Sequence, residues 1–515
     1  MTPLLTMGQM LSVHAALRPD KIGARDLARS MTFLEWNRRS CRLANALLGL
    51  GLAKGDRVAV LAYNRVEWLE IYAAVAKAGL IAVPINFRLL GPDIAYIVEN
   101  CGARAFVVED ALLGALEGVR RDLAVPAQNF VQLGGHPAAG YRGYEDLLSA
   151  ASDAEPTVVV APEDIWVLMY TSGTTGKPKG AMRSHGSQAL LAFTTLLDFA
   201  FSEPDTCLLV MPLCHANSLN FLASFGYAGA TIAIYDRRSF DAEELFGTLA
   251  SVRASFTSLV PTNYIMMLGL PAATKARHDV DCVQKLLVSS APARRDTKLA
   301  IMEQFRNAGL YELYGSTEQG WATILRPAEQ LTKLGSVGRE FTGSGRIKLI
   351  GEDGEEVPEG EVGELYSRTP WCFSGYWNLP EKTAEAFRGH WLSVGDMARR
   401  DDEGYYSLVD RKNNMIISGG ENVYPSEVEN LLGGHPKVKD VAVIGRPDDK
   451  WGEAVHAVIV LRDGESATGA EFVEWCSSRI AGYKRPKSFA FIADADMPRT
   501  ATGKILHRVL KQKLG

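Results

Sequence analysis

The densest group of side chains suited to phosphate binding lies at residues 170–185, YTSGTTGKPKGAMRSH, directly after the apolar run IWVLM. Its glycines, hydroxyl groups and lysines can supply backbone N–H groups, O–H donors and positive charge to a polyphosphate. The segment is not a Walker A loop, GxxxxGK[ST], because the position five residues after Gly173 is Pro178. A surface turn rich in small polar residues is the alternative, but the order of the residues favours a phosphate loop in a strand-to-helix connection.

A second segment, residues 311–320 with the sequence YELYGSTEQG, carries three side chains suited to a nucleotide. Tyr314 can stack on a base, Thr317 can donate to a phosphate, and Glu318 can bind a hard divalent cation. A lone glutamate is more often solvated. Its combination with a phosphate loop favours a ligand role.

Three charged residues in the last quarter of the chain complete the set. Asp396 lies fifteen residues before Arg411 across an expected hairpin, where the carboxylate could take both hydroxyls of a ribose and the arginine could add a contact. Lys504 follows a glycine-containing turn in PRTATGKILHRVL. Exposed hairpin charges and a solvated terminal lysine are the alternatives, and the other motifs argue against them.

The elements that must position these groups follow two patterns. Short apolar runs alternate with helical segments from Asp56 to about residue 334, which is typical of parallel sheets covered by helices, and we expect two stacked α/β layers. Residues 335–410 alternate polar and apolar positions with turns, which predicts antiparallel hairpins. A small α+β pattern fills residues 411–515 and predicts a separate C-terminal domain.

Composition narrows the class of protein. The chain has 515 residues, 47% hydrophobic and 22% charged, so it is globular and too long for one core. Its net charge of −5 argues against nucleic-acid binding. Its seven scattered cysteines contain no CxxC pair, which argues against a disulfide framework or zinc site and favours the cytoplasm. No signal peptide or membrane-spanning stretch is expected.

Taken in this order, the four segments resemble the adenylate-forming superfamily of acyl-CoA synthetases, firefly-type luciferases and peptide-synthetase adenylation domains. The resemblance covers roughly residues 12–510. It implies a multidomain α/β fold: a large N-terminal domain, residues 1–410, of two α/β subdomains plus a small β-barrel, followed by a small mobile α+β domain, residues 411–515, that carries Lys504.

The resemblance also implies a role for each matched position. ATP would contact Thr171, Ser172, Gly173, Thr174, Thr175, Gly176, Lys177, Lys179, Tyr314, Gly315, Ser316, Asp396 and Arg411. The implied catalytic residues are Thr317 as an α-phosphate donor, Glu318 as the Mg²⁺ contact, Lys504 between the acid carboxylate and the α-phosphate, and His215 near the acyl and thiol channel.

Three further groups follow from the same resemblance. The acyl pocket would be lined by His215, Leu219, Tyr264, Ser290, Gly320 and Trp321. The coenzyme A channel would contain Ser418, Gly419, Gly420 and Glu421, and Asn413 would be the hinge, where relatives often have Asp or Lys. The family segment GGAPL reads SSAPA at residues 289–293, which places a hydroxyl near the expected acid pocket.

These residues predict an AMP-forming acyl-CoA synthetase that uses ATP, Mg²⁺ and coenzyme A. We expect an apolar monocarboxylic acid, fatty or aryl, because no Arg or Lys is seen near the expected pocket to meet a second carboxylate. The alternatives are a stand-alone acyl-AMP ligase that loads a carrier protein in trans, and a nucleotide-binding pseudoenzyme. A lysine acetyltransferase acting on Lys504 is a candidate regulatory partner, because acetylation removes the charge.

Overall fold

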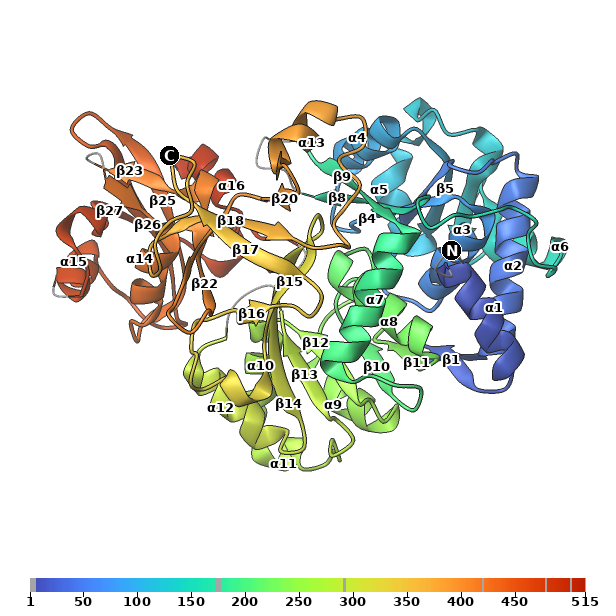
Figure 1. Cartoon of the computed structure of the whole chain (residues 1–515), viewed down its shortest axis with the longest axis horizontal. Coiled ribbons are helices and arrows are strands. Elements are labelled where there is room, and N and C mark those ends of the chain that lie inside the picture. The colour runs from blue at the N-terminus through green and yellow to red at the C-terminus, as the bar shows by residue number, and fades with distance from the viewer. Residues whose placement is uncertain are drawn as a thin grey trace. The chain divides into compact units, whose positions relative to one another are not determined.

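The computed structural model of the protein describes residues 6–171, 177–289, 293–418, 421–477, 479–500 and 503–514, except for the side chain of Asn413. The chain divides into two compact units (Figure 1). Unit 1 comprises Met1–Arg346 and Ser367–Leu392, and unit 2 comprises Ile347–Tyr366 and Ser393–Gly515. The expected domain boundary between residues 410 and 411 stays a prediction.

One layer of unit 1 is a seven-stranded sheet, drawn in colours from blue to green in Figure 1. Its strands, in spatial order, are β7 (Arg142–Gly143), β6 (Phe130–Leu133), β5 (Ala103–Glu109), β3 (Arg57–Leu61), β4 (Ile81–Ile85), β8 (Ile165–Thr171) and β9 (Lys179–Ser184). All neighbours are parallel except β8 and β9. The accompanying helices are α1 (Met7–Leu17), α2 (Phe33–Gly49), α3 (Glu67–Ala78), α4 (Gly91–Cys101), α5 (Leu113–Glu117) and α6 (Tyr144–Ala150).

The other layer of unit 1 is a nine-stranded sheet. Its strands, in spatial order, are β16 (Arg339–Glu340), β15 (Gly320–Leu325), β14 (Gly309–Ser316), β13 (Lys285–Val288), β12 (Phe256–Leu259), β10 (Thr206–Leu209), β11 (Thr231–Ile234), β1 (Ile22–Arg25) and β2 (Ser30–Thr32). The central strands are parallel and both edges are antiparallel. Its helices are α7 (His185–Phe199), α8 (Ala216–Ala228), α9 (Ala242–Ser251), α10 (Pro261–Leu268), α11 (Ala272–Lys275) and α12 (Arg295–Gln304).

One hydrophobic core joins the two layers of unit 1. It contains residues of β3 and β8 from the first sheet, residues of β10 and β12 from the second, and the buried sides of α3, α7 and α8. Helix α3 is buried on nearly all sides, as its apolar sequence EWLEIYAAVAKA requires. The prediction of two stacked α/β layers is therefore confirmed.

Antiparallel strands occupy the region expected to be β-rich. They are β17 (Gly345–Ile350), β18 (Gly363–Arg368), β19 (Phe387–Arg388), β20 (Trp391–Leu392), β21 (Asp396–Arg400) and β22 (Tyr406–Arg411), with helix α13 (Pro380–Ala386) between β18 and β19. The division between the units falls within β17 and β18. Strand β18 pairs with β20 through Ser367 and with β21 through Gly363 and Glu364.

The rest of unit 2 is a small α+β fold, as predicted. A five-stranded sheet contains β23 (Ile416–Ser418), β24 (Glu421–Val423), β25 (Val438–Asp448), β26 (Gly452–Leu461) and β27 (Ser488–Phe491). The helices are α14 (Pro425–Gly433), α15 (Gly469–Ser477) and α16 (His507–Leu514). No helix in the described part of the chain has the length and apolar character needed to cross a membrane.

Candidate active site

The phosphate-loop segment connects two antiparallel strands of unit 1. Thr171 ends β8 and lies opposite Lys179, which begins β9. Ser172, Gly173, Thr174, Thr175 and Gly176 lie outside the described residues. The sequence suggested a strand-to-helix connection, but residues 179–184 form an additional edge strand before α7, because KGAMRS alternates small or polar positions with apolar ones and pairs along β8.

Helix α4 contacts the phosphate-loop hairpin near both ends of the loop. The Tyr96 hydroxyl donates to the Pro178 carbonyl at 3.2 Å, and the Lys177 ammonium lies 5.1 Å from the centre of the Tyr96 ring. The Tyr170 hydroxyl donates to Asn100 at 2.6 Å. Both ends of the expected phosphate loop are therefore attached to a rigid helix.

The second motif is a tight hairpin between β14 and β15. Tyr314 is buried, with 7% exposure, and a register shift follows it before Gly315 pairs with Trp321. A side chain at Gly315 would lie 2.1 Å from the Gly320 carbonyl oxygen, and Gly320 itself has a φ of +67°. Glycine is required at Gly315 because the two strands approach so closely, and at Gly320 because of its positive φ.

Three consecutive backbone carbonyls in this turn each accept a hydrogen bond from a different donor. Arg183 of β9 donates to the Thr317 oxygen at 3.3 Å, and the Phe373 N–H donates to the Glu318 oxygen at 2.7 Å. The Thr369 hydroxyl donates to the Gln319 oxygen at 2.7 Å. The backbone of the Glu318 turn is therefore fixed from two sides.

The Glu318 side chain lies beside the phosphate-loop hairpin. Its Oε1 accepts from the Tyr376 hydroxyl at 2.9 Å and from the Thr171 hydroxyl at 3.3 Å, and the residue is only 7% exposed. The Lys179 ammonium lies 4.1 Å from the centre of the Tyr376 ring. The fold thus brings Thr171, Lys179 and Glu318 together around Tyr376.

This arrangement suits a magnesium ion that is carried by a nucleotide. Glu318 offers hard carboxylate oxygens, the ligand type that Mg²⁺ prefers. Among the described residues, no group of three or more His, Cys, Asp or Glu side chains could hold a metal by itself. The remaining ligands would therefore be water and phosphate oxygens, which is the usual arrangement for Mg²⁺ at a polyphosphate.

The expected ribose and lysine residues all lie in unit 2. Asp396 and Arg411 face each other across the β21–β22 hairpin, with Arg411 Nε 3.0 Å from Asp396 Oδ1. Lys504 is exposed beside a turn closed by the Thr500 N–H, which donates to the Lys504 oxygen at 2.7 Å. Desolvation and the nearby Arg411 lower the pKa of Lys504, while Asp396 opposes this.

Two family models match the chain. The model described as AMP-binding enzyme matches residues 11–377, and the model described as AMP-binding enzyme C-terminal domain matches residues 427–504. The chain belongs to the AMP-binding enzyme family. The expected resemblance to the acyl-CoA synthetase branch of the adenylate-forming superfamily is confirmed.

Similar proteins act on different acids, according to their names. The enzyme is 36% identical to a feruloyl-CoA synthase of an Amycolatopsis species, over 98% of each chain. It is also 36% identical to the long-chain-fatty-acid–CoA ligase FadD13 of Mycobacterium tuberculosis, over 94% of this chain and 93% of the other. The crystal structure of the anthranilate CoA ligase AuaEII in complex with anthranoyl-AMP has a TM-score of 0.90 at 28% identity, covering 100% of this chain and 98% of the other.

Of the expected acyl-pocket residues of this AMP-binding enzyme, Leu219 lies in α8, Tyr264 in α10, and Gly320 and Trp321 in β15. His215 precedes α8, and burial together with Arg88 lowers its pKa to about 4, so the ring is neutral at pH 7. Leu219 and Tyr264 are fully buried, and the Tyr264 hydroxyl donates to the Leu287 carbonyl at 3.1 Å. Ser290 lies outside the described residues.

Gly320 and Trp321 begin β15, and Trp321 packs in the hydrophobic core of unit 1. The Trp321 N–H donates to Thr195 at 3.1 Å, and a side chain at Gly320 would lie 2.5 Å from Trp371. The assignment of these residues to an acyl pocket stays a prediction.

The expected coenzyme A and hinge residues are partly described. Ser418 is buried in β23 and pairs with the exposed Glu421 of β24. Gly419, Gly420 and the side chain of Asn413 lie outside the described residues. Their roles also stay predictions.

Two side chains of the site were missed by the sequence reasoning. Tyr376 contacts Glu318 from a segment 58 residues further along the chain, and Arg183 is 2% exposed beside Thr317, where burial lowers its pKa to about 10. Gly375 and Tyr376 read as an ordinary turn, and Arg183 reads as a surface charge next to a loop. Only the tertiary fold brings them to the site.

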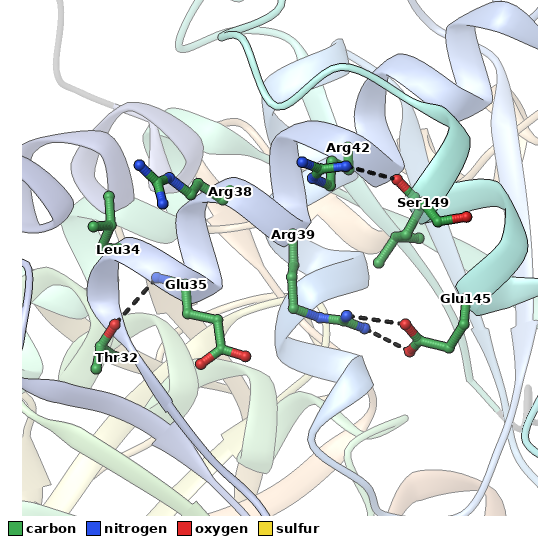
Figure 2. Close-up of a pocket in the computed structure, with 9 residues that line it drawn as sticks. Thr32, Leu34, Glu35, Arg38, Arg39, Arg42, Glu145 and Ser149 are labelled. Carbon is green, nitrogen blue, oxygen red and sulfur yellow. Dashed lines mark hydrogen bonds and ion pairs between the residues drawn. The ribbon is translucent and has the colours of Figure 1, made fainter.

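A hollow of about 440 Å³ lies elsewhere in unit 1, between α2 and α6 (Figure 2). Figure 2 shows Arg39 pointing toward Glu145, and the two side chains form hydrogen bonds of 2.6 and 3.0 Å. Arg39 also pairs with the buried Glu70 at 2.7 Å. None of the expected site residues lines this hollow, so it is not part of the candidate active site.

Proposed function

We propose that this enzyme joins an apolar monocarboxylic acid, fatty or aryl, to the α-phosphate of ATP and then transfers the acyl group to coenzyme A. The observation that supports this most directly is the meeting of Thr171, Lys179 and the Glu318 carboxylate at one end of the phosphate-loop hairpin. Such a group can bind a metal-bound polyphosphate, and the family membership supports adenylation.

The first step needs no general base. A carboxylic acid with a pKa of about 4–5 is already ionised at pH 7, so the barrier comes from repulsion between two anions. Lys179, Thr317 and Lys504 would supply positive charge and hydrogen bonds where phosphoryl charge concentrates. Mg²⁺ held by Glu318 would neutralise charge on the phosphates of ATP. Pyrophosphate leaves as the acid oxygen bonds to the α-phosphorus.

In the second step the thiol of coenzyme A attacks the acyl carbon and AMP leaves. A thiol with a pKa of about 8.5 supplies some thiolate at neutral pH, and AMP is a good leaving group. His215 would lie near this channel as a neutral ring, so it can contribute a hydrogen bond without adding charge. The apolar side chains of Leu219 and Trp321 are compatible with an uncharged acyl group.

Two measurements test this proposal. Acid-dependent exchange of labelled pyrophosphate into ATP reports the first step, and release of AMP on adding coenzyme A reports the second. A panel of fatty and aromatic acids identifies the substrate class, and replacing coenzyme A by a holo-carrier protein separates the two acceptors. Formation of ADP, or nucleotide binding without exchange with any acid, would contradict the proposal.

A further inference from the structure

Tyr376 lies in a segment whose backbone is attached to the phosphate-loop hairpin. The Met182 N–H donates to the Gly375 oxygen at 3.0 Å, and the Trp377 N–H donates to the Gly180 oxygen at 2.8 Å. The Tyr376 N–H itself donates to the Thr383 hydroxyl at 2.8 Å. With 5% exposure and its backbone held on both sides, Tyr376 has little freedom to move relative to β9.

The Tyr376 hydroxyl orients the Glu318 carboxylate. It donates to Oε1 at 2.9 Å, and the Thr171 hydroxyl donates to the same oxygen at 3.3 Å. Among the described residues, no hydrogen bond reaches Oε2 of Glu318. A hydroxyl bond to a carboxylate oxygen is directional, so the shorter bond from Tyr376, with the longer contact from Thr171, restricts rotation of the carboxylate and leaves Oε2 for another ligand.

The same tyrosine contacts a second residue of the site through its ring. The Lys179 ammonium lies 4.1 Å from the ring centre, within the range of a cation–π contact. One side chain therefore places both the expected metal ligand and a lysine of the expected phosphate loop. A tyrosine that only filled space in the core, or that only contacted solvent, would not need contacts with both Glu318 and Lys179.

We propose that Tyr376 is a positioning residue that holds Glu318 so that Oε2 meets the metal ion of metal–ATP. This inference rests on the proposed nucleotide site, but it concerns metal-dependent binding and not the identity of the acid. Without the hydroxyl, the carboxylate can rotate, and part of the metal's binding energy is lost in restoring its orientation.

The test is Tyr376→Phe, which removes the hydroxyl and keeps the ring against Lys179. Binding of Mn²⁺–ATP, followed by calorimetry and by the electron paramagnetic resonance of Mn²⁺, should weaken by about three- to tenfold, the effect of one hydrogen bond. Binding of ATP in EDTA should stay within twofold. The melting temperature provides a check on folding.

A double-mutant cycle shows whether the effect passes through Glu318. In the Glu318→Gln background, Tyr376→Phe should cause no further loss of Mn²⁺–ATP affinity. Tyr141→Phe is the matched control, because the Tyr141 hydroxyl also donates to a glutamate, Glu117, at 2.6 Å and its ring also lies 4.0 Å from a cation, Arg120, but none of the three is an expected site residue. It should leave Mn²⁺–ATP affinity within twofold.

Equal weakening of ATP binding with and without metal would overturn the inference, as would additive losses in the cycle. Failure of the proposed function gives a different result. If the wild-type enzyme exchanged no pyrophosphate with any acid, the metal-binding comparison between Tyr376 and Phe would still report on the positioning role.

Discussion

The buried ion pair between Lys298 of α12 and Glu312 of β14 allows a quantitative test of the fold around the site. The ammonium lies 2.7 Å from Glu312 Oε2, and the two side chains are 1% and 5% exposed. Glu312 Oε1 also accepts from the Ala293 N–H at 3.1 Å. The pair therefore holds Ala293, the last residue of the SSAPA segment, which is expected near the acid pocket.

Replacing Lys298 by Met keeps the volume of the side chain but leaves a buried carboxylate without its cation. Breaking such a pair typically lowers the free energy of unfolding by about 3–5 kcal/mol. The double variant Lys298→Met/Glu312→Met should lose less, about 1–3 kcal/mol, because it leaves only the Ala293 N–H without its acceptor. Urea unfolding followed by circular dichroism at pH 7 measures both.

The pH dependence gives a second readout of the same pair. Burial already raises the pKa of Glu312, and removing Lys298 should raise it further. The folded Lys298→Met protein then binds a proton more readily than the unfolded chain. Its loss of unfolding free energy relative to the wild type should therefore become smaller as the pH falls from 7 to 5. Lys382→Met is the control, because the partner Glu385 is 60% exposed and such a pair contributes less than about 1 kcal/mol. A Lys298 variant no less stable than this control would refute the reasoning.

Three more substitutions test individual residues. Lys504→Ala should slow adenylation by about 10²–10³-fold but spare thioester formation from supplied acyl adenylate, and equal slowing of both half-reactions would contradict its assigned role. Asp396→Ala should raise the KM for ATP by about tenfold or more through loss of hydrogen bonds to the ribose. An unchanged KM would show that Asp396 is only a charged residue of the hairpin. Burial lowers the pKa of His185 to about 4, so the folded protein resists its protonation and should lose up to about 3 kcal/mol of stability as the pH falls from 6.5 to 4. His185→Phe, which keeps the stacking on Trp166, should show a smaller loss in urea unfolding, and an unchanged pH dependence would exclude His185 as its source.

Local patterns were enough to predict the layers of the fold. Alternating apolar strands and helical segments predicted parallel sheets, because each buried strand must be covered on both faces. The spacing of Asp396 and Arg411 predicted that they would face each other, and their register across β21 and β22 confirms it. In a hairpin, the separation of two residues in the sequence is enough to predict that they pair across the strands.

Contacts between distant segments could not be predicted in this way. Strand β9 was missed because a short edge strand with KGAMRS reads as part of a loop. Tyr376 reaches Glu318 only because residues 374–377 pair with β9, a contact that neither segment encodes by itself. The burial of Arg183 depends in the same way on α7 and on the turn at Thr317.

The three fixed carbonyls of the Thr317–Glu318–Gln319 turn limit how the enzyme can evolve toward other acids. A backbone whose oxygens are bonded to β9 and to residues 369–373 cannot shift to fit a new substrate without losing several hydrogen bonds at once. Directed evolution for a different acid should therefore accumulate substitutions among the side chains of α8 and α10 and leave this turn unchanged. Adaptability and catalytic geometry would then be encoded in separate parts of the chain.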